Sequence, residues 1–258
     1  MSRIISIANQ KGGVGKTTTS VNLAACLAAA GKKVLLLDLD PQGNATSGIG
    51  FNKDEISPTI YEMLIQKATP QETIRQHPFI ENLFIIPSNI ELVGSHNDLH
   101  NDPKKYFRLK NILKEMNHNP KFDYIIIDCP PSLGILTVNA LIASNDLLIP
   151  IQCEYYAMEG VSLMVKTLQK VRQKANTSLN LFGVVLTMYD IRTNLSKQVE
   201  QEIRKHFTDR VFKTVIPRSI RLGEAPSHGM PIILYELRST GSQAYIQLTE
   251  EVLQRYGR

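Results

Sequence analysis

The sequence contains no tryptophan and only three cysteines in 258 residues. Cys26, Cys129 and Cys153 lie far apart and form no Cys-x-x-Cys pair. This spacing argues against a zinc ribbon, a redox motif or a disulfide scaffold, and it is typical of a chain in a reducing cytoplasm. Because free cysteines are most often buried, we expect these three to act as small apolar core residues.

Long apolar segments are missing as well. The apolar runs at 34–37, 124–127 and 147–151 are short, whereas a membrane-spanning helix needs about 20 apolar residues. The first residues, MSRIISIANQ, lead directly into a glycine-rich loop and leave no room for a signal peptide. We therefore expect a cytoplasmic protein with a single domain over 1–258 and no helix-turn-helix domain ahead of the loop.

Charge is unevenly distributed along the chain, whose net charge is +5. Residues 1–165 hold 14 basic and 16 acidic side chains, whereas residues 166–258 hold 15 basic and 8 acidic ones. A basic C-terminal third is typical of a surface that faces a polyanion. A solvated face with scattered lysines would give the same count, so charge alone leaves both interpretations open.

Short apolar runs alternate with helical patterns along the chain. The runs predict buried strands at 3–8, 32–40, 82–88, 122–132, 146–151, 181–189 and 211–217. Helical spacing predicts helices at 16–30, 60–65, 72–76, 104–116, 136–143, 158–175, 195–207 and 244–256. Residues 41–51 have a loop composition, and 117–120 should end the helix that precedes them. We predict an α/β fold with a mostly parallel sheet of seven to eight strands, covered by helices on both faces.

The stretch NQKGGVGKTTT, residues 9–19, lies between the first predicted strand and the first predicted helix. It ends like the phosphate-binding pattern G-x-x-x-x-G-K-[ST], but Gln10 stands where the first glycine should be. The strand before it and the helix after it are the context that this motif requires. The stretch therefore predicts a P-loop NTPase-like fold with a nucleotide at the carboxyl ends of the strands.

Each residue type in this stretch suits a phosphate ligand. The three glycines allow the backbone to turn and to direct N–H groups at a phosphate beside the helix N-terminus. Lys16 can reach the β- and γ-phosphates, and the Thr17 hydroxyl can ligate Mg²⁺. A second lysine, Lys11, is left without a role by this pattern.

Three aspartates follow predicted strands: Asp38 and Asp40 end LLLDLD, and Asp128 ends YIIID. A buried acid is costly unless it is paired or lies near a cation, and Mg²⁺ beside a triphosphate is the natural partner. Asp128 could also cap a helix, and Asp40 could form an Asx turn before Pro41. Phosphoryl transfer needs a group that orients water and a cation for the transition state, for which Asp40 and Lys11 are the remaining candidates.

Four sequence blocks together resemble one family, the ParA/MinD ATPases. KGGVGKTT resembles their deviant Walker A box, and DLDPQGNAT resembles the segment after their second strand. YIIIDCPPSLG resembles their Walker B region, and VIPRSIRLGEAPSHGMPI their C-terminal signature. The blocks extend from residue 4 to residue 233, and they are most similar to the small chromosomal type called ParA or Soj.

The resemblance implies a homodimer that clamps two ATP molecules, with Mg²⁺, between its subunits. Lys11 would then be the signature lysine that reaches the partner's phosphates in trans, like an arginine finger. By the same resemblance Asp40 positions the hydrolytic water and acts with Lys11 and Lys16 in catalysis, while Thr17 and Asp128 hold Mg²⁺, Asp128 through water. The implied ATP-binding residues are Lys11, Gly12, Gly13, Val14, Gly15, Lys16, Thr17 and Thr18 and, near the adenine, Met188, Pro217, Arg218 and Ser219.

The family binds DNA without sequence preference, and only as the ATP-bound dimer. Arg192 and Arg221 match arginines implicated in this binding, and Arg218 and Lys205 extend the expected patch. Phosphate contacts alone would make the binding sensitive to salt and blind to sequence. The resemblance thus implies a nucleoid-associated DNA segregation switch, for chromosome or plasmid, whose hydrolysis a ParB-type partner stimulates.

A membrane-associated division-site regulator of the MinD kind is the main alternative. It requires an amphipathic, usually cationic C-terminal helix. In AYIQLTEEVLQRYGR, Glu250 and Glu251 balance Arg255 and Arg258, and the apolar residues suit packing on a core. We therefore expect no membrane partner.

An electron-transfer ATPase with an iron–sulfur cluster is a third possibility. It requires paired cluster cysteines from two subunits. Cys129 directly follows Asp128, and Cys153 has no recognisable context, so we do not expect a cluster.

Overall fold

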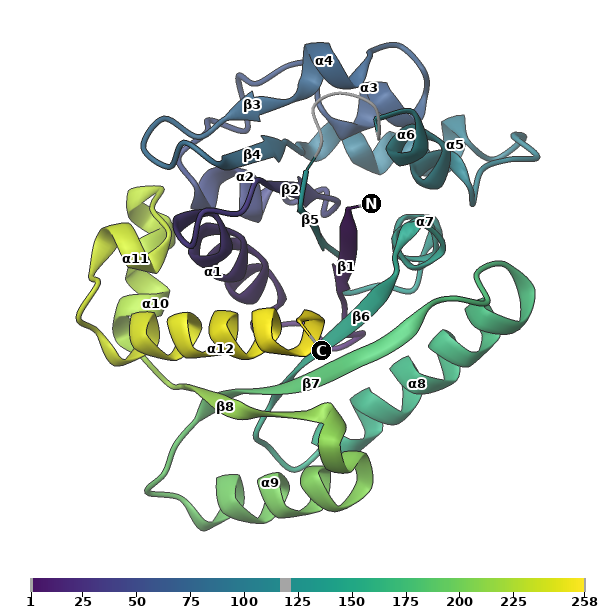
Figure 1. The fold of residues 1–258 in the computed structure, drawn as a ribbon. Coiled ribbons are helices and arrows are strands. Elements are labelled where there is room, and N and C mark those ends of the chain that lie inside the picture. The colour runs from purple at the N-terminus through teal and green to yellow at the C-terminus, as the bar shows by residue number, and fades with distance from the viewer. Residues whose placement is uncertain (1, 117–121, 258) are drawn as a thin grey trace.

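The computed structural model describes residues 2–116 and 122–257. Within them, eight strands form one sheet in the order β3-β4-β2-β5-β1-β6-β7-β8 (Figure 1). Every neighbouring pair is parallel except β3 and β4, which are antiparallel. The α/β class and the number of strands are thus confirmed. The strands are β1 Arg3–Ile7, β2 Val34–Asp38, β3 Arg75–Gln76, β4 Leu83–Ile86, β5 Tyr124–Asp128, β6 Asp146–Gln152, β7 Asn180–Tyr189 and β8 Val211–Pro217.

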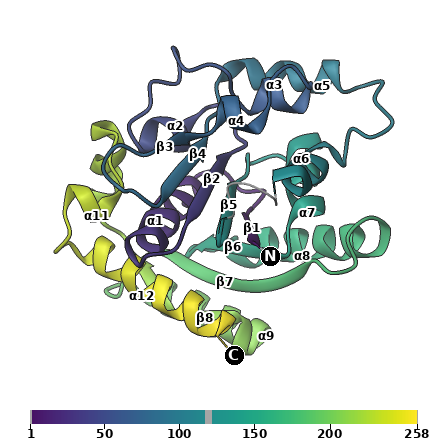
Figure 2. The same cartoon turned by 45° about the horizontal axis from the view of Figure 1, so that its top comes forward.

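Helices cover both faces of the sheet, because successive strand residues point to opposite sides. Leu36 and Ile126 belong to an apolar cluster with α1 and α12, whereas Leu35 and Ile125 belong to a second cluster with α6, α7 and α8. Figure 2 shows these two groups of helices on opposite sides of the strands. The α-helices are α1 Lys16–Ala29, α2 Asn44–Gly48, α3 Ile60–Leu64, α4 Pro70–Thr73, α5 Ser95–Asp98, α6 Arg108–Met116, α7 Ile135–Ala143, α8 Ala157–Lys174, α9 Asn194–Phe207, α10 Ile220–Glu224, α11 Ile232–Tyr235 and α12 Thr240–Tyr256, and the 3₁₀ helices are η1 Ile90–Gly94, η2 Thr208–Arg210 and η3 Ala225–His228.

The prediction of a helix at 72–76 is wrong, both in where the helix begins and in where it ends. Thr69 and Glu72 form a capping box that starts a single turn, α4. The Arg75 guanidinium then bonds the carbonyl oxygens of Glu72, Ile74 and Ser57. Because these bonds hold the chain away from a helical path, Arg75–Gln76 pairs with β4 as the short strand β3.

Further boundaries differ from the expectation: the strand expected at 122–132 is Tyr124–Asp128, and the helix expected at 244–256 begins at Thr240. The segment 41–51 is not wholly a loop, since Asn44–Gly48 forms α2 after Gly43 in a left-handed conformation with φ 61°. The helix expected at 104–116 begins at Arg108. The expectation that 117–120 ends that helix lies outside the described residues.

The carboxyl ends of the central strands meet at one edge of the sheet. Ile7 of β1 and Asp38 of β2 both align with Asp128 of β5, and Tyr189 of β7 aligns with Pro217 of β8. Each predicted motif follows one of these ends, so the topology brings residues that are far apart in sequence to one edge.

Candidate nucleotide site

The loop between β1 and α1 has the backbone that its glycines allow. Gly13 has φ +74° and Gly15 has φ +83°, a left-handed region that other residues adopt only with strain. Gly15 is the N-cap of α1 and offers no capping side chain to the first turn. The first amides of this 14-residue helix can therefore serve an anionic ligand.

Hydrogen bonds with β6 and β7 hold the loop in place. Asn9 donates from Nδ2 to the Pro150 carbonyl at 2.8 Å and accepts the Lys11 N–H at 3.1 Å. Thr187 donates from Oγ1 to the Val14 carbonyl at 2.9 Å. Asn9 fixes the start of the loop beside Gln10, where the ordinary pattern has a glycine. Neither Asn9 nor Thr187 was predicted, since only the neighbouring strands give them their partners.

The two lysines of the loop lie in different surroundings. The side chain of Lys16 is directed back across the loop, and its Nζ donates to the Lys11 carbonyl at 2.9 Å. Burial lowers the pKa of Lys16, and the nearby Asp128 and Asp40 oppose that shift. The Lys11 ammonium instead forms an ion pair with Glu154, in the loop after β6, and both side chains are about one-third exposed. Lys16 therefore lies across the loop that the sequence predicts to bind phosphate, while Lys11 is held at the surface by its own subunit.

Asp38 and Asp128 are both fully buried, but their carboxylates differ in the hydrogen bonds that they accept. Asp38 accepts the Asp40 N–H at 3.1 Å, and both the N–H and the hydroxyl of Thr46 at 2.8 Å. Asp128 accepts the Ser20 hydroxyl at 2.9 Å through Oδ1, whereas its Oδ2 has no hydrogen-bond partner among the described residues. Burial is the largest cause that raises the pKa of both carboxyls. The free oxygen is on Asp128, where a cation would compensate for its burial.

The free Asp128 oxygen fits the magnesium site that the sequence predicts. The Thr17 hydroxyl lies close enough to Asp128 to favour its charged form. Oxygen donors are the ligands that Mg²⁺ prefers, usually together with substrate phosphates and water. Across 2–116 and 122–257, no three acidic, histidine or cysteine side chains gather into a metal cluster. The donor set therefore suits a cation that arrives with a nucleotide.

Asp40 lies just beyond β2 and is 8% exposed. Its Oδ1 accepts the Gln42 N–H at 3.0 Å, so the Asx turn that the sequence allowed before Pro41 is present. The residue also lines the cleft beside the glycine-rich loop. The turn and a role in the cleft are thus compatible.

Two clefts meet at the loop. One of about 350 Å³ is lined by loop residues and by Asp40 and Pro131, and one of about 210 Å³ extends from it toward β8. Both contain Gly15, Thr18 and Met188. The second contains all four residues expected near the adenine, which are Met188, Pro217, Arg218 and Ser219. A larger cavity of about 840 Å³ beside α6 contains none of the predicted residues.

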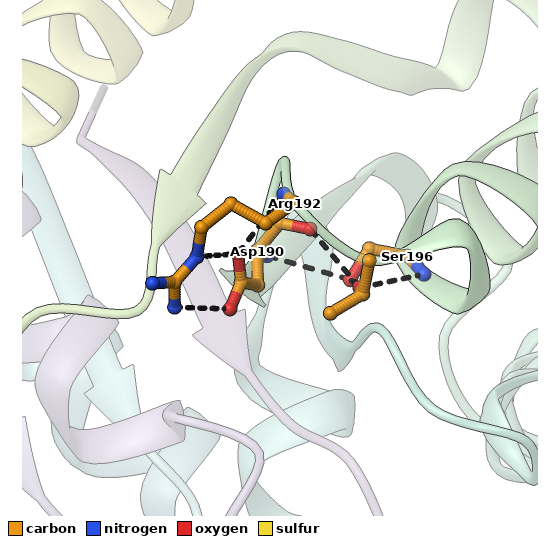
Figure 3. A network of polar contacts seen from close by, with 4 residues as sticks. Asp190, Arg192 and Ser196 are labelled. Atoms are coloured by element: carbon orange, nitrogen blue, oxygen red, sulfur yellow. Dashed lines mark hydrogen bonds and ion pairs between the residues drawn. The ribbon is translucent and has the colours of Figure 1, made fainter.

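Three of the four expected DNA-binding residues follow the ends of β7 and β8. Arg192 is 83% exposed and binds Asp190 through Nε at 2.9 Å and Nη2 at 2.7 Å (Figure 3). Arg218 is close enough to help lower the pKa of Asp190, though less than Arg192 does. Arg221 is 55% exposed and pairs with Glu224. Lys205 lies in the last turn of α9, toward the start of β8, so the structure does not bring it together with the three arginines.

The three cysteines are buried, and none is disulfide-bonded to another described residue. Burial is the main cause that raises the pKa of each thiol, for Cys26 and Cys153 to about 12. Their expected role as small core residues is confirmed.

The C-terminal helix packs on the sheet. Tyr245, Leu248 and Val252 of α12 are buried in the cluster that also holds α1. Arg255 donates to the Phe182 and Val211 carbonyls at 3.0 and 3.2 Å. Throughout the part of the chain that the structure describes, every helix is too short or too polar to cross a membrane.

Known proteins share both the sequence and the fold. A family model described as an AAA domain matches residues 2–181. The chain is 54% identical over 252 residues to the sporulation initiation inhibitor protein Soj of Bacillus subtilis, with 98% of each chain covered. It is 46% identical over 257 residues to the chromosome-partitioning ATPase Soj of Treponema pallidum, with 100% of this chain and 99% of the relative covered.

A solved structure shares the fold of this chain. Cobyrinic acid a,c-diamide synthase from Mycobacterium smegmatis, with bound ADP and magnesium, superposes with a TM-score of 0.87 at 35% identity, covering 100% of this chain and 97% of that one. The fold, the glycine-rich loop and the sequence similarity thus indicate the same class of protein, the P-loop ATPases with a mostly parallel sheet. The chain belongs to the Soj and ParA family of chromosome-partitioning ATPases.

Proposed function

We propose that the protein is an ATP-driven DNA segregation switch that works as a homodimer. It is an ATPase that uses ATP with Mg²⁺, as the names of its relatives and the ligands of its structural neighbour indicate. The ATP-bound dimer binds DNA without sequence preference on the nucleoid, and a ParB-type partner stimulates hydrolysis and release. The single observation that carries the proposal is one cleft that joins Lys16, Thr17 and Asp40 beside the free oxygen of Asp128.

The predicted site residues divide between nucleotide binding and hydrolysis. The loop amides and Lys16 bind the phosphates, and the apolar cleft toward β8 takes the adenine. Thr17 and Asp128 hold Mg²⁺, which when bound neutralises charge on the β- and γ-phosphates. Asp40 accepts a hydrogen bond from the attacking water and aligns it with the γ-phosphate.

Lys11 connects hydrolysis to the dimer. Lys16 already faces the phosphate position of its own subunit, whereas the Lys11 ammonium is held at the surface by Glu154. A lysine in that place can leave an exposed partner at little cost, since such pairs contribute about 1 kcal/mol or less. We propose that Lys11 leaves Glu154 to contact the phosphates of the partner subunit when ATP is bound.

A MinD-like membrane regulator is less well supported. Its C-terminal helix would have to present an apolar face to lipid, whereas the apolar face of α12 is buried against α1 and the sheet. The arginines at the ends of β7 and β8 supply a surface for DNA phosphates instead. Co-sedimentation with DNA and with liposomes, each with and without ATP, separates the two functions directly.

Two substitutions test the nucleotide site. Lys16→Ala should abolish ATP binding, because it removes the buried cation from the loop. Asp40→Ala should keep ATP binding and dimerisation but lose turnover, because it removes only the group that orients water. Lys170→Ala, an exposed lysine on α8, is the control. Tight ATP binding by Lys16→Ala, or turnover at the normal rate by Asp40→Ala, would refute the corresponding role.

A further inference from the structure

The backbone of Asp40 is held on both sides by buried groups. Its N–H donates to Asp38 Oδ1 at 3.1 Å, and its carbonyl accepts the Ser88 hydroxyl at 2.8 Å. Asp38 and Ser88 are both fully buried. Since these bonds fix the peptide groups at either end of the residue, they also fix the direction in which the Asp40 side chain leaves the backbone.

Thr46 of α2 joins the two holding residues. Its hydroxyl donates to Asp38 Oδ2 at 2.8 Å and accepts the Ser88 N–H at 2.9 Å. Its own N–H also donates to Asp38 Oδ2 at 2.8 Å, and the residue is fully buried. The threonine hydroxyl thus uses both its donor and its acceptor capacity in one network.

The network connects three separate segments of the chain. Asp38 ends β2 and Asp40 lies just beyond it, Thr46 lies on α2, and Ser88 follows β4. Asp38 accepts one hydrogen bond on Oδ1 and two on Oδ2, whereas Oδ2 of Asp128, on the neighbouring strand β5, accepts none from the described residues. A buried carboxylate with this set of bonds serves structure rather than a metal.

We propose that Thr46 and Ser88 are positioning residues for ATP hydrolysis, which hold Asp40 through Asp38 and through its own carbonyl. The proposal rests on the role of Asp40 in the proposed function. Alignment of a reacting water is sensitive to displacements of about 1 Å, which can lower a rate by about 100-fold. Neither Thr46 nor Ser88 lines the two clefts. Substitutions in this network should therefore leave ATP affinity nearly unchanged.

Thr46→Val is the sharpest test, because it keeps the shape of the side chain and removes the hydroxyl. We expect kcat for ATP to fall by about 10- to 100-fold, while KM and ATP affinity change by less than about 3-fold. Thr46→Ser restores the hydroxyl and should recover most of kcat. Ser88→Ala should lower kcat in the same way, and it serves as the test if Thr46→Val does not fold.

Thr249→Val is the matched control. Thr249 is a buried threonine on α12 whose hydroxyl donates to the Tyr245 carbonyl at 2.8 Å, and Thr249 itself lines neither cleft. It should lower thermal stability while leaving kcat within about 2-fold. If Thr46→Ser lowered kcat as much as Thr46→Val does, or if both variants reduced ATP affinity as much as kcat, the positioning role would be wrong.

A double variant distinguishes a failure of the positioning role of Thr46 from a failure of the proposed role of Asp40. In the Asp40→Ala background, Thr46→Val should have no further effect on the residual rate, since the group that it positions is gone. A full additional loss would overturn the positioning role while leaving Asp40 catalytic. Normal turnover in Asp40→Ala alone would instead refute the proposed role of Asp40.

Discussion

Asp38 and Asp128 stand side by side in the register of two parallel strands, and both side chains are completely buried. Asp38 receives three hydrogen bonds, whereas one oxygen of Asp128 receives none from the described residues. The charge of Asp38 also raises the pKa of Asp128, after the larger effect of burial. The strand ends therefore combine one structural carboxylate with one that a cation can stabilise.

The stability of the nucleotide-free protein should fall as the pH rises toward about 8. Burial, with the charge of Asp38, raises the pKa of Asp128 to about 8, against about 3.9 in an unfolded chain. Between these values the folded state holds the extra proton. The contribution of Asp128 is thus fully present below about pH 4 and is lost as the pH rises through about 8.

Thermal unfolding in EDTA, from about pH 6 to about pH 8.5, measures this dependence. Asp128→Asn should flatten the curve, because the amide does not titrate. Mg²⁺ and ATP should bind more tightly as the pH rises through the same range, since the metal needs the ionised carboxylate. An Asp128→Asn variant with the wild-type slope would assign the titration to another group.

Freeing Lys11 should favour the ATP-dependent dimer. Glu154→Gln removes the charge that holds the Lys11 ammonium in its own subunit. An exposed pair contributes about 1 kcal/mol at most, so we expect up to about 5-fold tighter dimerisation with ATP. Sedimentation equilibrium with ATP and with ADP measures the change.

Lys11→Ala is the complementary variant and should lose ATP-dependent dimerisation or hydrolysis while keeping some ATP affinity. Glu202→Gln, at an exposed glutamate on α9, controls for the change in net charge that Glu154→Gln makes. If Lys11→Ala were normal in both assembly and turnover, Lys11 would be an ordinary surface lysine.

The sequence predicts those parts of the molecule that local patterns determine. The apolar runs gave seven of the eight strands, and the loop from Gly12 to Thr18 was found from its glycines and Lys16. Short elements were harder, because α2 and β3 depend on long-range bonds that no local pattern encodes. Gly43 introduces α2, but its helical turn is held by Asp38.

The same limit applies to the site. Asp40 and Asp128 could be chosen because they end apolar strands. Glu154 could not, since it meets Lys11 across 143 residues, and Ser88 meets Asp40 across 48. Such partners follow from the order of strands in the sheet, which composition and periodicity leave undetermined.

DNA retention should depend on the arginines at the ends of β7 and β8. Arg221→Glu should weaken binding in a low-salt shift assay with dimerisation intact, and it should reduce the slope of log affinity against log salt by about 1. Asp190→Asn should have the opposite effect, because Asp190 neutralises Arg192. Arg172→Glu, an exposed arginine on α8, is the control for net charge.

Lys205→Glu adds a test of the geometry. Lys205 lies at the far end of α9 from Arg192, so its reversal should change DNA retention less than that of Arg221. If Arg221→Glu left DNA retention unchanged, or if Arg172→Glu reduced it equally, the DNA-binding surface would have to lie elsewhere.

Packing of α12 should contribute strongly to stability. Leu248 is fully buried in the cluster that α12 shares with α1, and Leu248→Ala should lower the free energy of unfolding by about 2–5 kcal/mol. Gln254→Ala, at an exposed position of the same helix, should change it by less than about 0.5 kcal/mol. Urea unfolding of both variants measures the difference. A helix kept for a membrane would give the reverse pattern, with little loss of stability in Leu248→Ala and a clear loss of ATP-dependent liposome binding.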